Sequence, residues 1–177
     1  KFASEEMEVF IVTGDKDFMQ LVDDNISIID DKKNFIIKRE EVIEKFGVPP
    51  EQVIDVLGLA GDTSDNIPGI FKVGVKTASK YVSQFGDVED VIRAAEAGKI
   101  KGKTGERVAA EADNARLSKV LATIRLDVPM DLTLEDLRPK GIQEEPLREL
   151  FDRWEFGLVA KKLLPAVEAI DGSKYRT

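Results

Sequence analysis

The sequence predicts a mixed α/β core followed by an all-helical lobe. Over the first 60 residues, short apolar runs rich in β-branched residues alternate with helical patterns, as in an α/β sheet. After Gly69 the pattern changes to short helical segments separated by glycines. With 177 residues, 42% of them hydrophobic, the chain can bury the core of one domain or of two closely packed lobes.

The predicted core begins with a buried strand over residues 9–12, a continuous apolar run that ends at Thr13-Gly14. Asp15 and Asp17 follow at its C-terminal end, which is the edge where open α/β sheets usually bind ligands. A helix is expected from Pro50, because proline suits a first helical turn. The remaining predicted core elements are a short helix over 18–22, strands over 26–29 and 34–37, and helices over 39–46 and 50–60.

The helical lobe is predicted to contain four helices, over 75–85, 88–97, 105–113 and 115–123. We expect the large apolar residues of the last helix to pack inward: Leu117, Val120, Leu121 and Ile124. Residues 132–137 are expected to be extended with a short turn, before closing helices over 145–154 and 158–164. The predicted division is therefore core 1–60, a helical lobe 61–125, a closing segment 126–170 that packs on the core, and a polar linker 171–177.

Composition limits the chemistry, because the chain contains no histidine and no cysteine. Imidazole bases, thiolate nucleophiles and Cys/His zinc sites are therefore excluded. Clustered aspartates favour a hard cation, Mg²⁺ or Mn²⁺. The lack of cysteine fits a cytosolic protein, and no apolar stretch approaches the length of a membrane span. We expect a soluble, intracellular protein.

Charge is unevenly distributed. A net charge of −8 and a pI of about 4.8 argue against a generic DNA-binding protein, whose surface should be basic. Residues 69–125, however, contain eleven Lys/Arg and seven Asp/Glu, so this segment is net basic. One lobe could face a nucleic-acid backbone while the other gathers metal-binding carboxylates. Scattered surface charge is the alternative.

Two pairs of aspartates are candidate metal ligands. Asp15 and Asp17 are two residues apart, so they point to the same face if extended geometry persists past the first strand. Asp62 and Asp65 are three apart, which makes them neighbours in a helical turn or tight loop. Brought together, the pairs could hold two Mg²⁺ ions that activate water for phosphodiester hydrolysis. Taken separately, Asp17 could cap the helix after it and Asp65-Asn66 could form a turn.

The segment from Gly69 to Gly74, followed by a helix, predicts a helix–hairpin–helix. Its glycines let backbone N–H groups approach a phosphate, and the N-terminus of the next helix favours an anion. Lys72 and Lys76 add positive charge there. Such contacts are independent of DNA sequence. An ordinary helix hairpin with solvated lysines is the alternative. A weaker basic group, with a solvated loop as its alternative, contains Lys99, Lys101, Lys103 and Arg107.

Four motifs, in this order, resemble the 5′ nuclease domain of bacterial DNA polymerase I, over residues 9–164. They are Thr-Gly-Asp-Lys-Asp, Gly-Asp-Thr-Ser-Asp-Asn-Ile-Pro-Gly, Val-Gly-Val-Lys-Thr-Ala and Leu-Ser-Lys-Val-Leu-Ala-Thr-Ile-Arg. The resemblance implies a PIN-like α/β core, a helix–hairpin–helix (helix-three-turn-helix) lobe and relatives among flap endonucleases and phage 5′ exonucleases. It also implies Mg²⁺-dependent removal of 5′ flaps and RNA primers in replication and repair.

Carried over residue by residue, the resemblance assigns two ions, Mg²⁺ or Mn²⁺, to Asp15, Asp17, Asp62 and Asp65. It assigns DNA contacts to Gly69, Lys72, Val73, Gly74, Lys76, Thr77 and Lys119, with hairpin carbonyls able to hold K⁺. The implied partners are DNA with a 5′ flap or nick, RNA primer–DNA hybrids and a polymerase domain in the same parent chain. A monomer at the bacterial nucleoid in the cytoplasm, with no membrane contact, is expected.

Two departures from the family pattern shape the expectation for this chain. Family members carry an upstream half with the first strand, a helical arch and further acidic ligands, none of which precedes Lys1. We therefore expect a fragment that binds DNA with little or no cleavage. Phe71 stands where proline or a small residue is expected in the hairpin. The alternatives are a stand-alone 5′ nuclease, a non-catalytic helix–hairpin–helix binding module and a different acid-dependent phosphohydrolase.

Overall fold

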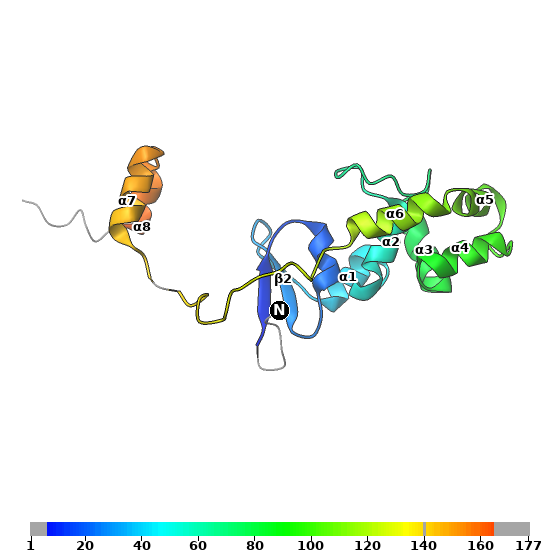
Figure 1. The fold of residues 1–177 in the computed structure, drawn as a ribbon, viewed down its shortest axis with the longest axis horizontal. Coiled ribbons are helices and arrows are strands. Elements are labelled where there is room, and N and C mark those ends of the chain that lie inside the picture. The colour runs from blue at the N-terminus through cyan, green and yellow to red at the C-terminus, as the bar shows by residue number, and fades with distance from the viewer. Residues whose placement is uncertain (1–6, 140, 165–177) are drawn as a thin grey trace, which may run out of the picture. The chain divides into compact units, whose positions relative to one another are not determined.

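The computed structural model describes residues 7–139 and 141–164 (Figure 1). These residues belong to two compact units, the first ending at Pro129 and the second beginning at Met130. Within the described ranges, no helix is long and apolar enough to cross a membrane.

A three-stranded sheet in the order β1-β2-β3 opens the first unit. β1 (Val9–Val12) runs parallel to β2 (Ile26–Asp30), and β3 (Phe35–Ile37) pairs antiparallel with β2. The two parallel strands are joined through η1 (Lys16–Leu21), a 3₁₀ helix with Met19 buried. The predicted strands are confirmed, and the predicted short helix begins two residues earlier, at Lys16.

The helices after the sheet build the centre of the first unit. α1 (Arg39–Phe46) ends at Gly47, whose φ of +72° lies in the left-handed region. The helix predicted over 50–60 is divided into a 3₁₀ turn, η2 (Pro50–Gln52), and α2 (Val53–Ala60). α2 is apolar on nearly every side and almost wholly buried, which places it in the core rather than on the surface.

Four further helices complete the first unit: α3 (Val75–Phe85), α4 (Val88–Glu96), α5 (Gly102–Ala110) and α6 (Ala112–Ala122). α3 and α4 agree with the prediction, but α5 and α6 each begin three residues earlier than predicted. Gly105 was expected to start α5. It lies inside the helix instead, where it allows close packing, since a Cβ there would be only 1.9 Å from the carbonyl oxygen of Ile100.

The orientation of α6 differs from the prediction. Its large residues Leu117, Val120 and Leu121 are exposed, whereas its buried positions carry Ala112, Ala115, Ser118 and Ala122. The reason is its close crossing with α2, since a Cβ on Gly58 would lie 2.9 Å from the Cβ of Lys119. Only small side chains fit between helices at this separation, so the expectation that Leu117, Val120 and Leu121 pack inward is wrong. Ile124, the fourth residue of that expectation, lies beyond the helix and is half-buried.

The second unit contains α7 (Glu144–Arg153) and α8 (Gly157–Leu163). Phe151 is buried, and its ring centroid lies 6.4 Å from that of Phe156. Both closing helices are confirmed. The segment 132–137, expected to be extended with a short turn, contains a turn in which the Leu137 N–H donates to the Leu134 carbonyl at 3.2 Å. The domain boundaries and the packing of the closing segment on the core stay predictions, and the linker 171–177 lies outside the described residues.

Candidate metal centre and hairpin

The loop after α2 is closed by two glycines. Gly61 and Gly69 have φ of +69° and +59°, and a Cβ on Gly69 would lie 2.3 Å from the nitrogen of Gly61. Only glycine allows this approach. Between them, Asp62 and Ile67 exchange backbone hydrogen bonds of 2.9 and 2.7 Å. The result is a compact loop that holds Asp62 and Asp65 together at the end of α2.

Asp17 is carried by η1, and its geometry differs from the expected extended one. The chain turns into the 3₁₀ helix at Lys16, directly after Asp15. Asp15 caps this helix, because its Oδ1 accepts a hydrogen bond from the Asp17 N–H at 3.0 Å. The argument that Asp15 and Asp17 share one face of an extended strand is therefore wrong. The capping role considered for Asp17 belongs to Asp15.

Both carboxylate-bearing segments are anchored to α6. The Gln20 side chain at the end of η1 donates to the Ala122 carbonyl at 3.0 Å and accepts from the Ile124 N–H at 2.9 Å. The Gly69 N–H, at the end of the loop, donates to the Ser118 hydroxyl at 2.9 Å. Because these bonds connect residues far apart in sequence, α6 fixes the position of η1 relative to the loop.

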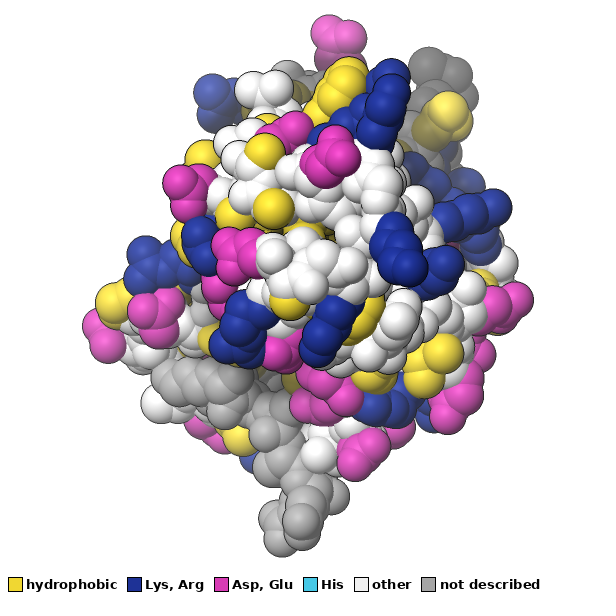
Figure 2. Space-filling view, turned by 90° about the vertical axis from the view of Figure 1, so that its right-hand side faces the viewer, with side chains coloured by type: hydrophobic (Ala, Val, Ile, Leu, Met, Phe, Trp, Pro, Cys, Tyr) yellow, Lys and Arg dark blue, Asp and Glu magenta, His cyan; other side chains and the backbone are white. Residues whose placement is uncertain are grey.

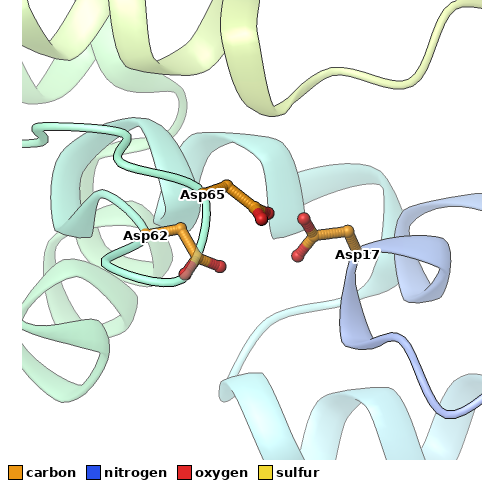
Figure 3. Close-up of side chains that lie close together, drawn as sticks. All are labelled: Asp17, Asp62 and Asp65. Carbon is orange, nitrogen blue, oxygen red and sulfur yellow. The ribbon is translucent and has the colours of Figure 1, made fainter.

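The anchoring brings three of the four predicted aspartates together. Asp17, Asp62 and Asp65 each offer one carboxylate oxygen, and these oxygens lie within 4.8 Å of one another (Figure 3). The Oδ1 atom of Asp17 is buried without a hydrogen-bond partner. Such an orphaned carboxylate oxygen, facing two further carboxylates, fits a hard divalent cation. The residues present can therefore hold a metal.

The charges around the cluster shift the pKa values of its members in opposite directions. Burial raises the pKa of Asp17, and the nearby carboxylates of Asp15 and Asp62 raise it further. The hydrogen bond from Lys16 lowers the pKa of Asp62, although burial opposes this. The Lys16 contact with Asp62 is short, since Nζ is 2.7 Å from Asp62 Oδ2.

Asp15 is not one of the three. Besides capping η1, it lines a cavity of about 440 Å³ whose wall also includes Asp30, Phe35 and Lys45. Its assignment as a metal ligand stays a prediction.

The predicted hairpin follows the acidic loop. The left-handed φ of Gly69 and Lys72, +59° and +60°, turns the chain between α2 and α3. Gly74 caps α3, and a Cβ added to it would meet nothing within 4 Å, so no contact among the described residues accounts for a glycine there. Lys72 and Lys76 are exposed beside it, whereas the Val73 side chain is buried in the core and Thr77 is half-buried.

Three contacts of Phe71 in the hairpin were not predicted. Phe71 is 62% exposed, and two cations lie near its ring, with Lys72 Nζ at 5.2 Å and the Arg107 guanidinium at 5.5 Å from the ring centroid. The Phe71 N–H donates to Glu111 Oε2 at 2.8 Å, so an internal carboxylate already occupies one hairpin amide. Arg107 belonged to a basic group recognised in the sequence, but only the fold brings it to Phe71. Figure 2 faces the α4–α5 end and shows groups of Lys and Arg side chains with acidic ones between them.

Lys119 makes a contact within the core rather than with the hairpin. Its Nζ is 2.6 Å from Oδ1 of Asp55, a buried residue of α2. The same oxygen accepts from the Val88 N–H at 2.9 Å. Asp55 thus joins the start of α4 to α2 and α6. The contact explains Lys119 as a structural residue, and its assignment to DNA binding stays a prediction.

Comparison with protein families agrees with this geometry. Residues 1–47 match the family described as 5′-3′ exonuclease, N-terminal resolvase-like domain, and residues 48–145 match 5′-3′ exonuclease, C-terminal SAM fold. The chain belongs to the 5′-3′ exonuclease family. The predicted fold class and the resemblance to polymerase I nucleases are confirmed.

The chain is similar both to DNA polymerases I and to a shorter 5′-3′ exonuclease. It is 37% identical to DNA polymerase I of Caldicellulosiruptor bescii over 169 residues. This aligned region covers 92% of the chain and 20% of that protein. The chain is 40% identical over 164 residues to DNA polymerase I of Bacillus caldotenax, with 90% and 18% covered. A 5′-3′ exonuclease of Buchnera aphidicola is 38% identical over 154 residues, with 83% and 53% covered. The chain thus spans a fifth or less of the polymerases and about half of the exonuclease.

Two solved structures from phage T5 share the fold of this chain. The phage T5 D15 protein co-crystallised with metal ions has a TM-score of 0.60 at 24% identity, covering 65% of the chain and 43% of that protein. T5 5′-exonuclease with bound divalent metal ions (zinc) gives 0.59 at 24% identity, with 65% and 42% covered. Of these two neighbours, the T5 5′-exonuclease is described with bound divalent metal ions and the D15 protein with metal ions in the crystal.

Proposed function

We propose that this chain is part of a Mg²⁺-dependent, structure-specific 5′-3′ exonuclease and 5′-flap endonuclease of DNA polymerase I. Its substrates are phosphodiesters of 5′ flaps and RNA primers, removed during replication and repair. The observation that carries this proposal is the convergence of Asp17, Asp62 and Asp65 from two separate segments, with oxygens within 4.8 Å. The match to the 5′-3′ exonuclease family supports it.

The aspartates hold the metal in the proposed reaction. Mg²⁺ or Mn²⁺, when bound, polarises the phosphate and lowers the pKa of a coordinated water. Asp17 reaches the cluster from η1, while Asp62 and Asp65 reach it from the loop after α2. Since hydrogen bonds to α6 fix both segments, the ligand oxygens are positioned before any cation arrives. The second ion, K⁺ at the hairpin and Asp15 as a ligand belong to this proposal as further expectations.

The hairpin binds the DNA backbone in this proposal. Gly74 leaves open space at the N-terminus of the eleven-residue helix α3, where a phosphate can approach backbone N–H groups. The exposed Lys72 and Lys76 supply charge on either side. Since such contacts reach phosphates rather than base edges, binding should depend on DNA shape and salt instead of sequence.

We infer that this chain alone binds DNA with little or no cleavage. Three carboxylates do not neutralise two divalent cations, and the full length of the exonuclease relative is about twice the matched part. A stand-alone nuclease remains the second candidate, favoured by the Buchnera exonuclease, of which 53% is matched. The parent protein is proposed to act as a monomer at the bacterial nucleoid.

The test uses an end-labelled 5′-flap duplex and a blunt duplex of equal length, with Mg²⁺ or EDTA. We expect tighter binding to the flap, no cleavage by this chain, and a salt slope about 0.9 smaller for Lys76→Ala. Lys80→Ala, also exposed on α3 but one turn further from the hairpin, should bind as the wild type does. Absence of duplex binding at low salt would contradict the proposed function. Mg²⁺-dependent cleavage would support the nuclease and refute the inferred inactivity.

A further inference from the structure

Lys16 stands inside the acidic cluster as its only contacting cation among the described residues. Its Nζ lies 2.7 Å from Asp62 Oδ2. The two partners differ in exposure, since the Asp62 side chain is 3% exposed and that of Lys16 is 40% exposed. The pair therefore has a buried, fixed end at the carboxylate and an accessible end at the ammonium.

The charge of the cluster depends on this lysine. Asp17, Asp62 and Asp65 carry three negative charges at neutral pH when all are ionised, and Lys16 cancels one of them. A divalent cation at the same oxygens would lie next to the ammonium, and the two would repel each other. Lys16 and a metal ion therefore compete for Asp62.

We propose that Lys16 is an internal counter-cation that holds Asp62 in its ligand position without metal and leaves it when a divalent cation binds. This inference rests on the proposed function of the cluster as a metal site. Lys16 is a positioning residue, which acts through Asp62, and it sets the cation affinity of the cluster.

The exchange requires movement of only one partner. Asp62 is fixed independently of Lys16, because its Oδ1 accepts from the Ser64 N–H at 2.8 Å and its backbone is paired with Ile67. Lys16 has a long, flexible, partly solvated side chain that can place its ammonium in water. The carboxylates can thus keep their positions while one cation replaces the other.

The test compares Mn²⁺ binding to the complete 177-residue chain and to Lys16→Met by titration calorimetry. Removing the competing ammonium should tighten Mn²⁺ binding by about three- to thirtyfold. Lys16→Arg keeps the cation and should stay close to the wild type. The control Lys33→Met removes a charge paired with Asp30 at 3.0 Å, outside the cluster, and should change the affinity by less than about twofold.

Thermal unfolding separates this role from a purely structural ion pair. In EDTA, Lys16→Met should melt lower than the wild type, because a buried carboxylate loses its partner. Saturating Mn²⁺ should remove most of this difference, because Lys16 no longer contacts Asp62 once the cation is bound. A lower melting temperature with unchanged or weaker Mn²⁺ affinity would overturn the proposal and leave the metal function standing. If neither protein bound Mn²⁺, the counter-cation and the proposed metal site would both be refuted.

Discussion

At the scale of single residues, Asp17 is held where its own charge is unfavourable. Burial and the neighbouring carboxylates raise its pKa, so its ionised form destabilises the fold. This destabilisation is present at pH values above the folded pKa and disappears as the pH falls below the unfolded value. A metal ion would remove it, since the cation compensates the negative charge.

We therefore expect Asp17→Asn to stabilise the protein without metal. In EDTA at pH 7, the gain should be about 1 kcal/mol or less, because solvent screens part of the repulsion, and roughly 2–4 °C in melting temperature. The gain should vanish near pH 3 and reverse in saturating Mn²⁺. Asp31→Asn, at an exposed turn, is the control and should show none of these effects. Asp17→Asn melting below the wild type at pH 7 in EDTA would contradict the account.

Three of the four aspartates singled out in the sequence, Asp17, Asp62 and Asp65, lie together in the structure, but most of their contacts could not be predicted from sequence. Asp62 and Asp65 were expected to be neighbours from their spacing, and the structure places them together. The role of Lys16 was missed, although it stands between two predicted ligands in the sequence. Its contact with Asp62 joins residues 46 positions apart, so no local pattern shows it. A lysine flanked by candidate ligands was the only signal available.

At the scale of elements, the crossing of α2 and α6 positions the site. Gly58 in α2 permits it, and the hydrogen bonds of Gln20 and Ser118 then connect α6 to both aspartate-bearing segments. A side chain that separates the two helices should therefore disturb stability and the site together.

Gly58→Ala tests this crossing. Its Cβ would lie 2.9 Å from Lys119 Cβ and 3.1 Å from Val88 Cγ2. We expect a net loss of about 1–2 kcal/mol, because overpacking outweighs the better helix propensity of alanine. Gly157→Ala in α8 is the control, since a Cβ there meets nothing within 4 Å. Unfolding should be followed by far-UV circular dichroism, because the single tryptophan, Trp154, lies in the other unit. A melting temperature equal to or above that of the wild type would refute close packing at Gly58.

Helices could be predicted from sequence more reliably than their buried faces. The bounds of α1 and α3 agree with the predicted ranges because glycines mark their ends or caps. In α6, hydrophobic spacing indicated that Leu117 and Leu121 face inward, but both are exposed. The buried face was set by the proximity of α2, which excludes large side chains. Periodicity alone carries no information about that distance.

At the scale of the whole molecule, the net charge understates what the basic segment can do. The chain has a net charge of −8, yet Lys72 and Lys76 flank the open backbone at Gly74 in sequence, and Arg107 of α5 contacts the Phe71 ring of the hairpin. Basic side chains at the α4–α5 end are interspersed with acidic ones, so DNA binding should depend on the hairpin more than on a continuous basic surface (Figure 2). The count of charged residues in the sequence predicted a basic lobe. It could not predict that acidic side chains lie between the basic ones on the surface of the lobe.

The central claim is that Asp17, Asp62 and Asp65 form one metal centre. Anomalous diffraction from crystals of this chain grown with Mn²⁺ would test it most directly. The account predicts an anomalous peak in direct contact with carboxylate oxygens of all three residues, with the Lys16 ammonium displaced from Asp62. A structure with Mn²⁺ bound elsewhere, and with Lys16 still paired to Asp62, would contradict it.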